Sequence, residues 1–520
     1  MGPVPETRAD PTLPLYEPMD LCSQDRVMAQ AMVEGAWDLQ VHQGCVHNEY
    51  RSLMGRVLQK VPSPHKANFT YLFRAVDALS LTESVGQLLG EQLLSHLPTG
   101  KRKVYEKALG SLSDCPVTRT DFLIKAFIKV EKLPLLPQDK EPRMIQARSP
   151  KFNAWFAQFT KPVEHDLYAL VDEYGLPVVA KGLSLAQRAE ALRSKWDLLE
   201  DPVAISFDLS RWDAHVSVEL LKVAHQYYLR KLPDPEFRMV LQHQLDNKGV
   251  TKHGLRYRVK GNVMSGDMTT ALGNCLIVVA IIEGFKLKYP DLTVLYLDDG
   301  DDHVILCNRS QYERLARKLT KFWTNLGHDL KVEGFTDQFN QIMFCQHKPI
   351  HLHGRWEMMP DPAKVLGTAL TVVGSDRLQK PKDLAAYLGT VWEMRSQLHS
   401  GMPVLGPLFK RLAMENKIRL GYGSRWKVLT GIQILTHLNR GRSVPSRITP
   451  EAREQVELMW GITPDEQCSL ERLIVRPPRT IVPTWGGNAS GRWPTRHYLK
   501  LVTPVGTLGK EQPLTLSLDS

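Results

Sequence analysis

The chain has 520 residues, of which 43% are hydrophobic and 23% are charged, which is typical of a globular protein and excludes a disordered or fibrous one. It carries 66 Lys and Arg against 56 Asp and Glu, and this net charge of +10 suits a polyanionic partner. The seven cysteines are scattered and contain no C-x-x-C pair, so we expect a reducing compartment. No apolar run reaches the length of a membrane span, and the best candidate, Leu276–Ile282, is far too short.

The N-terminal part of the chain offers few strong signals. Residues 1–20 contain five prolines and few large apolar residues, so we expect a flexible segment without a signal peptide. The cluster Lys101–Lys107 is densely basic and, taken alone, is typical of a solvated helix face.

A longer basic segment, Phe122–Arg148, alternates apolar residues with cations and is interrupted by a Pro-containing turn. The pattern predicts a strand, a loop and a second strand, with one face lined by positive charge. Such a face can bind a triphosphate or the phosphates of a nucleic acid. A charged hairpin exposed to water explains the same pattern equally well.

Val203–Asp208 is predicted to be a buried strand that ends in a carboxylate, and Asp213 follows five residues later. A charge at the end of a buried strand is costly, so it is more often functional than incidental. Ala214–Lys231 then shows apolar side chains at helical intervals and predicts an amphipathic helix.

The stretch Gly261–Gly284 begins with small polar residues and continues as an apolar helix. Ser265 or Asp267 is expected to cap this helix. Thr270 and Asn274 are four residues apart, so they share one helix face. A capped helix whose polar residues bond one another would also explain the pattern.

Val294–Cys307, VLYLDDGDDHVILC, predicts a hairpin, because two short β-rich runs flank a turn that contains Gly300. Four carboxylates lie at its tip and repel one another: Asp298, Asp299, Asp301 and Asp302. A hard divalent cation with oxygen ligands would offset that repulsion, although a lone GDD tripeptide is more often a solvated acidic turn.

Beyond the hairpin, Gln311–Leu326 predicts a helix that Gly327 ends. Leu330–Glu333 and Ile342–Gln346 predict short strands. From about residue 350 the chain is expected to be helical and basic, and beyond Pro477 it is expected to be irregular. One group of potential zinc ligands matches no standard zinc spacing: Cys345, His347, His351 and His353.

In this order and at these spacings, the segments resemble the palm of RNA-dependent RNA polymerases from positive-strand RNA viruses, above all the tombusvirus branch and next the flavivirus-type polymerases. The matching segments are DLSRWDAHVS (Asp208–Ser217), SGDMTTALGN (Ser265–Asn274) and GDD (Gly300–Asp302). RMIQARSP (Arg143–Pro150) also resembles the fingers motif that holds the incoming nucleotide. The resemblance covers roughly residues 120–350, and each motif is weak without the others.

The resemblance implies transfer of a nucleotide from an NTP to an RNA 3′-hydroxyl with two Mg²⁺ ions, for which Mn²⁺ is an expected substitute. The implied metal ligands are Asp208, Asp301, Asp302 and the carbonyl of Leu209. The implied catalytic residues are Asp208, Asp301, Asp302 and Lys331. Lys331 would protonate pyrophosphate, although an ordinary surface lysine has equal weight.

The resemblance also implies residues that hold the substrates. Those expected to bind the nucleotide are Lys129, Lys132, Arg143, Arg148, Asp213, Ser265, Thr270 and Asn274. Within that set Asp213, Ser265 and Asn274 are expected to select ribose, because a site built to bond the 2′-hydroxyl rejects a sugar that lacks it. Those expected to contact RNA are Lys101, Arg102, Lys103 and Gly266.

The implied fold is an α+β right hand with fingers, a palm built on a small antiparallel sheet, and a helical thumb. The expected boundaries are 1–20 for the flexible segment, 21–200 for the fingers and N-terminal extension, 201–231 and 261–349 for the palm, 232–260 for a fingers insertion, and 350–520 for the thumb and tail.

Three other functions remain open from the residues alone: a reverse transcriptase, an inactive palm-fold scaffold that binds RNA, and a calcium-binding acidic loop. The last has no EF-hand spacing. For a polymerase, the expected partners are template and nascent RNA, NTPs, a viral auxiliary replication protein and host factors. We expect the host cytoplasm as its location, with recruitment to membrane-associated replication complexes through a partner, since no anchor is evident.

Overall fold

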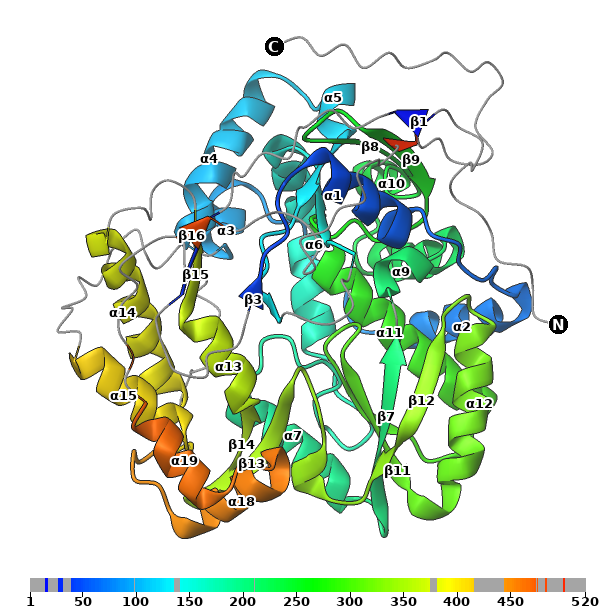
Figure 1. Cartoon of the computed structure of the whole chain (residues 1–520). Helices are drawn as coiled ribbons and strands as arrows, with labels where there is room; N and C mark the ends of the chain where they lie inside the picture. The colour runs from blue at the N-terminus through cyan, green and yellow to red at the C-terminus, as the bar shows by residue number, and fades with distance from the viewer. Residues whose placement is uncertain are drawn as a thin grey trace.

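The computed structural model describes residues 15–16, 27–30, 39–97, 99–134, 141–209, 211–374, 381–415, 444–473, 475, 482–483 and 499–500. Within these ranges, side chains are described from residue 41 onward, except those of 99–100, 134, 208, 374, 381–386, 482–483 and 499–500. The expected flexible segment 1–20 and the expected irregular tail lie almost entirely outside these residues. The mixture of helices with small sheets confirms the predicted α+β class (Figure 1).

The elements of the first half of the chain are β1 (Leu15–Tyr16), β2 (Val27–Gln30), β3 (Leu39–Gln40), α1 (Val46–Ser52), η1 (Leu53–Val57), η2 (Lys66–Asn68), α2 (Phe69–Leu79), α3 (Gly90–Ser95), α4 (Thr99–Asp114), α5 (Arg119–Phe122), β4 (Ile124–Ile128), β5 (Leu133–Pro134), β6 (Met144–Ala147), α6 (Pro150–Tyr168), α7 (Leu185–Asp197), β7 (Pro202–Leu209), α8 (Trp212–His215), α9 (Val218–Lys231), α10 (Pro235–Gln242), β8 (Asp246–Thr251) and β9 (Arg256–Lys260).

The elements of the second half are α11 (Thr270–Lys288), β10 (Leu295–Asp298), β11 (His303–Asn308), η3 (Arg309–Gln311), α12 (Tyr312–Thr324), β12 (Leu330–Thr336), η4 (Phe339–Gln341), β13 (His347–Leu352), β14 (Arg355–Pro360), α13 (Pro362–Ala369), β15 (Thr371–Gly374), α14 (Pro381–Leu398), α15 (Leu405–Glu415), α18 (Pro450–Trp460), α19 (Pro464–Glu471), β16 (Val482–Pro483) and β17 (Leu499–Lys500).

A four-stranded antiparallel sheet of order β10-β11-β7-β12 lies at the centre of the lower half of the molecule (Figure 1). Strands β10 and β11 are almost continuously apolar because both of their faces are covered. Ile205, Tyr296 and Ile305 face the core formed with α9, α11 and α12. Ala204 and Leu306, which alternate with them along the strands, face α7 on the other side. Because both faces of the sheet are packed against helices, the β10–β11 hairpin is held in a fixed position between two helical layers.

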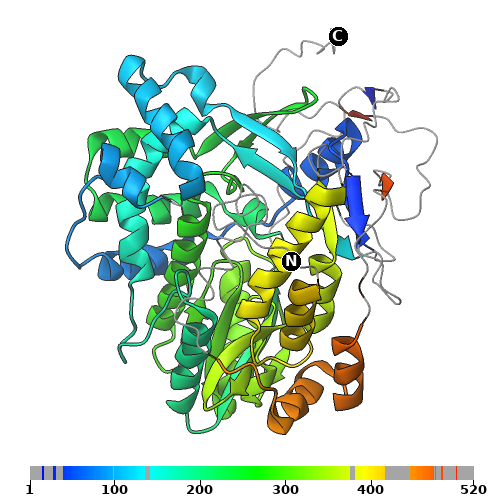
Figure 2. The same cartoon turned by 90° about the vertical axis from the view of Figure 1, so that its left-hand side faces the viewer.

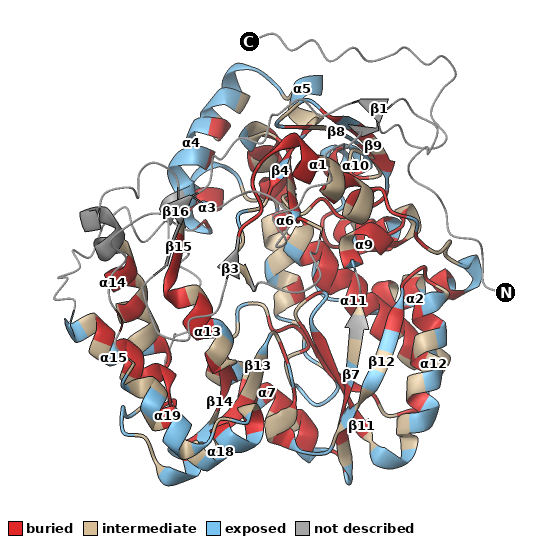
Figure 3. Ribbon diagram, viewed as in Figure 1, coloured by how far each residue is buried: buried red, intermediate tan, exposed pale blue. Residues whose placement is uncertain are grey.

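Helix α11 runs through the middle of the large core, and most of it is buried (Figure 3). The expectation that no segment could span a membrane needs correction, because α11 has the length and composition of a membrane-spanning helix. A core helix of a globular protein passes the same test, since it is apolar on all sides. Burial among α2, α9 and α12 accounts for the apolar sequence of this helix.

A second four-stranded sheet, of order β6-β4-β8-β9, lies at the top of the molecule. It joins the two predicted strands of Phe122–Arg148, now β4 and β6, to β8 and β9 from residues 232–260. Ile128, Met144 and Tyr257 lie in a small core beneath it, with α1 and η1. The segment between the two palm-like motifs therefore completes a sheet that begins a hundred residues earlier.

Several predicted elements were wrong in detail. The helix predicted over Ala214–Lys231 is two helices, α8 and α9, because Ser217 begins a new helix by accepting a hydrogen bond from the Leu220 amide at 3.2 Å. Ile342–Gln346 is not a strand, since Cys345 and Gln346 both have positive φ. They turn the chain into the β13–β14 hairpin, which replaces the helical start expected near residue 350. Helix α11 begins after Thr269, and neither Ser265 nor Asp267 caps it.

The C-terminal third packs as a separate helical layer formed by α13, α14, α15, α18 and α19, with its own apolar core. Figure 2 shows α14 and α15 side by side across the open front of the molecule from the two sheets. Strand β2 from the N-terminal segment lies between β15 and β16 in a three-stranded sheet, so the first described residues are tied to this C-terminal layer.

Candidate active site

The acidic tip is the turn between β10 and β11, where Gly300 adopts a φ of 93° that L-residues rarely adopt. A Cβ at this position would lie 3.3 Å from the Cβ of Asn274, so packing also favours glycine. This confirms the predicted hairpin and places its turn directly against α11.

Two of the four carboxylates at the tip are compensated inside the protein. Asp298 is fully buried, accepts the Gly300 N–H at 2.9 Å, and has a pKa raised well above its ordinary value by burial. Asp299 forms ion pairs with Lys181 at 2.6 Å and Arg188 at 2.9 Å. The expected mutual repulsion of four charges is therefore relieved for two of them without any bound cation.

The other two carboxylates, Asp301 and Asp302, are exposed and form no ion pair with the described residues. The pKa of Asp302 is raised by partial desolvation and by the negative charge of Asp301. The negative charge available to an external cation is thus concentrated on the last two residues of the GDD turn.

Strand β7 brings the first aspartate motif beside this turn. Its register with β11 runs from Asn308 opposite Pro202 to Ile305 opposite Ile205, and the rings of Phe207 and His303 lie 4.5 Å apart further along. Continued three residues beyond its last pair, the same register would place the backbone of Asp208 opposite Asp302. The side chain of Asp208 lies outside the described part of the structure.

Lys331 pairs in register with Asp208 from the other neighbouring strand, β12. Its side chain is exposed and does not line the central cavity. The structure thus places Lys331 close to the first aspartate motif along the chain backbone, while its role as proton donor stays a prediction.

A cavity of about 870 Å³ opens above the hairpin, between the two sheets and α11. It brings together many of the residues predicted to bind metal, nucleotide or RNA: Lys101, Lys129, Arg143, Leu209, Asp213, Ser265, Gly266, Thr270, Asn274 and Asp301. These residues are distributed over two hundred positions of the sequence, so their convergence is a property of the fold.

The predicted sugar-selecting residues lie on one wall of the cavity. Asn274 hydrogen-bonds to the carboxylate of Asp213, and its Oδ1 is buried without a partner among the described residues. Burial and the charge of Asp301 raise the pKa of Asp213 to about 6. Ser265 donates to the Met144 carbonyl at 2.6 Å, which leaves its oxygen able to accept.

Thr270 differs from its neighbours because its hydroxyl is already engaged. It donates to the carbonyls of Met264 at 2.8 Å and Asp267 at 2.9 Å. The side chain therefore closes the loop before α11.

The opposite wall carries positive charge from the β4–β6 strands. Arg143 and Lys129 both pair with Glu131, at 3.1 and 2.7 Å. The Arg143 side chain remains 53% exposed and that of Lys129 36%. Both cations are positioned at the cavity and can exchange a single carboxylate for a more highly charged ligand.

Other predicted cations lie outside the cavity lining, so their contacts with nucleotide or RNA stay predictions. Arg148 does not line the cavity, because its side chain is buried in an ion pair with Asp267. Lys132 donates to the Thr368 carbonyl at 2.7 Å, and burial together with the charge of Arg395 lowers its pKa to about 8. Arg102 bonds the Leu97 carbonyl, and neither it nor Lys103 reaches the cavity.

Two residues that the sequence analysis missed are Lys181 and Arg188, which neutralise Asp299. They precede and begin α7, a region without a recognisable motif. The chain reaches the hairpin there through an isolated bridge between Val179 and Asp298. No local sequence signal would have identified this contact.

The potential zinc ligands Cys345 and His353 have different neighbours in the structure. Among the residues that the structure describes, no group of three or more His, Cys, Asp or Glu side chains is arranged to hold a metal ion. Cys345 donates to Asp299 at 3.0 Å, whereas His353 contacts the Arg447 carbonyl, so the two side chains have separate partners.

Comparison with known proteins connects this geometry to a family. The family model described as viral RNA dependent RNA polymerase matches residues 17–479. The chain belongs to this family of viral RNA polymerases. Among similar relatives, the RNA-directed RNA polymerase of Tobacco necrosis virus (strain A) is 32% identical over 477 residues, covering 86% of this chain and 63% of the relative. That of Tomato bushy stunt virus (strain Cherry) is 31% identical over 453 residues, covering 84% and 54%.

The RNA-directed RNA polymerase of Maize chlorotic mottle virus is 30% identical over 484 residues, covering 90% of this chain and 49% of the relative. This member of the viral RNA polymerase family therefore spans about half to just under two thirds of the length of these relatives. The match to the tombusvirus branch confirms the resemblance drawn from the four motifs.

Proposed function

We propose that the chain catalyses RNA-templated RNA synthesis, adding nucleotides from NTPs to an RNA 3′-hydroxyl during replication of a viral genome. The main support for this proposal is the set of residues that line the central cavity. A single cavity combines an uncompensated carboxylate, Asp301, with the exchangeable cations Lys129 and Arg143 and with the sugar-sized polar pair Asp213 and Asn274. Nucleotide addition needs these three kinds of group in one place.

We assign the β10-β11-β7-β12 sheet with α9, α11 and α12 to the palm, and the β6-β4-β8-β9 sheet with α1 to α6 to the fingers. The helical layer from α13 to α19 then forms the thumb. The assignment is supported by the separate apolar cores of the helical layer and of the β6-β4-β8-β9 sheet. The core of the β10-β11-β7-β12 sheet also contains side chains of α2 and α6. It also gives the segment 232–260 its expected place in the fingers.

A divalent metal fits the donors at the hairpin tip. Adjacent exposed carboxylates without a cationic partner are the ligands that Mg²⁺ and Mn²⁺ prefer, and Asp301 and Asp302 form such a pair beside the backbone of Asp208. When bound, such ions would lower the pKa of the attacking 3′-hydroxyl and stabilise charge on the leaving phosphates.

The chain's own residues then divide the work of holding the nucleotide. Arg143 and Lys129 would exchange Glu131 for the triphosphate, which carries more charge and offers more acceptors. Asp213 would accept the proton of the 2′-hydroxyl, while Ser265 and Asn274 offer further polar contacts on the same wall. A deoxyribose would leave these groups unpaired, which is the physical basis of discrimination.

The template track is proposed along the exposed face of the fingers sheet. Ile145 lines the cavity and pairs with Phe127, whose ring is 45% exposed, so this face continues the cavity wall. Cations extend across the same face, on strands in register: Lys125, Lys248, Arg256 and Lys260. A basic sheet with an exposed aromatic ring suits single-stranded RNA, because phosphates bind the cations and a base can stack on the ring.

We further propose that template and nascent RNA, NTPs, a viral auxiliary protein and host factors are the partners of this chain. Its expected location in the host cytoplasm, with recruitment to membrane-bound replication complexes through a partner, is part of the same proposal. The burial of α11 supports recruitment through a partner rather than through this helix.

The proposal is tested by comparing Asp301→Ala with Asp291→Ala, which removes an exposed carboxylate paired with Arg314 far from the cavity. Primed extension of a homopolymeric RNA should fall on the order of a thousandfold or more in Asp301→Ala and remain near wild type in Asp291→Ala. RNA binding should persist in both. Extension at a near wild-type rate by folded Asp301→Ala would reject the site, and a preference of the wild type for dNTPs would favour a reverse transcriptase.

A further inference from the structure

Arg148 was expected to face the triphosphate, but its side chain is buried. Its contacts connect the end of β6 to the loop that precedes α11. The Arg148 side chain is 1% exposed and that of its ion-pair partner Asp267 is 4% exposed. Asp267 directly follows Ser265 and Gly266, and all three residues line the cavity on the sugar side. The carboxylate of Asp267 is almost completely buried against Arg148, so the ion pair lies at the edge of the surface that would contact the nucleotide.

The guanidinium of Arg148 joins three segments, which are the loop before α11, the end of α10 and strand β8. Besides Asp267, it donates to the His243 carbonyl at 2.7 Å and to Asn247 Oδ1 at 2.6 Å. Its planar fork matches this set of separated acceptors, which one ammonium group could not reach together. The ring of Phe152 lies 5.1 Å from the guanidinium carbon and covers it.

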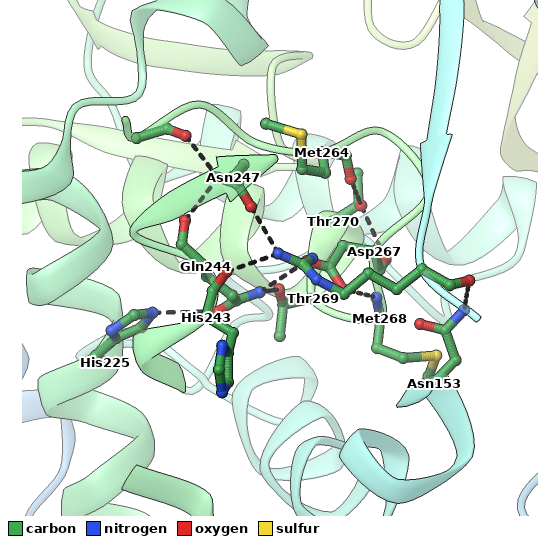
Figure 4. Close-up of polar contacts among 12 residues, drawn as sticks. Asn153, His225, His243, Gln244, Asn247, Met264, Asp267, Met268, Thr269 and Thr270 are labelled. Carbon is green, nitrogen blue, oxygen red and sulfur yellow. Dashed lines mark hydrogen bonds and ion pairs between the residues drawn. The ribbon is translucent and has the colours of Figure 1, made fainter. Parts of the chain in front are cut away.

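The acceptors of Arg148 are themselves fixed, as Figure 4 shows. Gln244 donates to Asp267 at 3.2 Å and to the Thr269 hydroxyl at 2.5 Å, and its own oxygen contacts His225 at 3.1 Å. Asn247 donates to the carbonyls of Gln244 and Gly261. Apart from the Nε of Arg148, which has no partner among the described residues, the side-chain donors and acceptors of Arg148, Gln244 and Asn247 are bonded. The network is rigid because a displacement would leave these polar groups unpaired.

The loop that this network holds runs along the free edge of β6. Three consecutive loop residues bond three alternate strand residues: Ser265 to the Met144 carbonyl, the Gly266 amide to the Gln146 carbonyl at 3.0 Å, and Asp267 to Arg148. A Cβ on Gly266 would lie 2.8 Å from the Gln146 carbonyl oxygen, so the loop has no room to move closer. The last of the three contacts is the only charged one.

We propose that Arg148 and Asp267 form a positioning pair that sets the discrimination between ribose and deoxyribose by holding the loop of Ser265 in place. The pair fixes the loop that presents Ser265, and it does so from the same strand that presents Arg143 to the triphosphate. Sugar recognition and phosphate recognition are thereby held at a constant separation. This inference rests on the proposed polymerase function.

The test uses Asp267→Asn and Arg148→Lys, with Asp172→Asn as the matched control. Asp172 forms a buried ion pair with Lys195, with side chains 5% and 1% exposed, and neither lines the cavity. Asp267→Asn and Asp172→Asn each remove a buried carboxylate charge, so a merely structural role would affect these two variants alike. Arg148→Lys keeps the positive charge but loses the planar fork that reaches several acceptors. The quantity measured is the ratio of kcat/KM for a ribonucleotide to that for its 2′-deoxy analogue, at temperatures where each variant is folded.

We expect the ratio to fall by about ten- to a hundredfold in Asp267→Asn, mainly through a higher KM for the ribonucleotide, because a small misplacement of a positioning loop has effects of that order. Arg148→Lys should lie between Asp267→Asn and wild type, and Asp172→Asn should keep the wild-type ratio. In a Ser265→Ala background, Asp267→Asn should change the ratio little further, since the pair acts through that loop.

Hydrogen exchange at the Gly266 and Asp267 amides supplies a readout that does not depend on activity. Exchange should accelerate in Asp267→Asn and Arg148→Lys but not in Asp172→Asn. An active wild type whose ratio is unchanged in both Arg148→Lys and Asp267→Asn, or changes equally in Asp172→Asn, overturns the positioning role. A wild-type protein that extends no RNA rejects the proposed function instead. Unchanged hydrogen exchange in Asp267→Asn and Arg148→Lys rejects the positioning role of the pair, whatever the activity measurements show.

Discussion

At the scale of single residues, the sequence alone could not show which aspartates of the hairpin are available to a cation. Four adjacent aspartates are equivalent on paper, yet Asp298 is buried and Asp299 is neutralised by Lys181 and Arg188. These two cationic side chains lie more than a hundred residues before the hairpin, so no local sequence pattern predicts their contact with Asp299. The motif order did identify Asp301, Asp213 and Asn274 as neighbours, because each lies at a fixed distance from an element end.

Asp213 gives a prediction at this scale, since burial and Asp301 raise its pKa to about 6 from an ordinary value near 3.8. A raised pKa means that the folded protein binds the proton more tightly than the unfolded chain, so this group's contribution to stability is present below about pH 4 and lost as the pH rises through about 6. Asp213→Asn should therefore be more stable than wild type above pH 6, and the gain should shrink towards pH 4.

Thermal unfolding between pH 4 and 7.5, with a chelator present to exclude metal, measures this difference. Asp197→Asn, which alters a carboxylate that is 52% exposed on α7, is the control and should show no such trend. A gain for Asp213→Asn that is independent of pH would mean that the substitution acts through packing rather than through ionisation.

At the scale of elements, local pattern predicted the strands well and the boundaries less well. Strands β7, β10 and β11 were predictable because apolar β-rich runs ended at charged or glycine residues. The break between α8 and α9 was missed because the helical spacing of apolar residues continues through it. The loop before α11 was misread as a cap because its polar side chains bond β6, an element more than a hundred residues earlier.

Gly266 supplies a prediction at this scale. Gly266→Ala should push the loop away from β6, because the new methyl would lie 2.8 Å from both the Ala147 Cβ and the Gln146 carbonyl oxygen. Overpacking of this kind typically costs about 1–3 kcal/mol of stability, and we expect a loss of about tenfold or more in ribonucleotide kcat/KM.

Gly110→Ala is the matched control for Gly266→Ala. It places a methyl on α4 with no atom within 4 Å, and in a helix this change should be neutral or slightly stabilising. Steady-state kinetics and thermal unfolding of the two variants make the comparison. Equal activity in both would show that the loop tolerates displacement.

At the scale of the whole molecule, the sequence supported the fold class through a resemblance rather than through pattern. The pairing of β4 with β8 joins segments that periodicity alone cannot align, because each is a short strand with many possible partners. The excess of positive charge was visible in the composition, but its concentration on one sheet face appears only when the strands are in register.

That face predicts how RNA binding depends on salt. Each phosphate neutralised on a single strand contributes a slope of about −0.7 in log K against log salt. Replacing Lys125, Lys248, Arg256 and Lys260 by Gln should therefore make the slope shallower by up to about 2.8. Replacing three exposed cations of α12, Arg314, Arg317 and Lys321, should leave it unchanged. If the two sets of substitutions change the slope equally, RNA binding depends on the overall charge of the protein and not on this face.

The three-stranded sheet β15-β2-β16 affects how the protein folds during its synthesis. Gln30 pairs with Thr371, so β2 leaves the ribosome 341 residues before its neighbour exists. At about 5–20 residues per second, the strand waits on the order of twenty to seventy seconds with both edges unpaired. Such edges are templates for pairing between chains, so crowding of nascent chains on one messenger favours swapped or aggregated products. The yield of folded protein then depends on what shields this four-residue strand during translation.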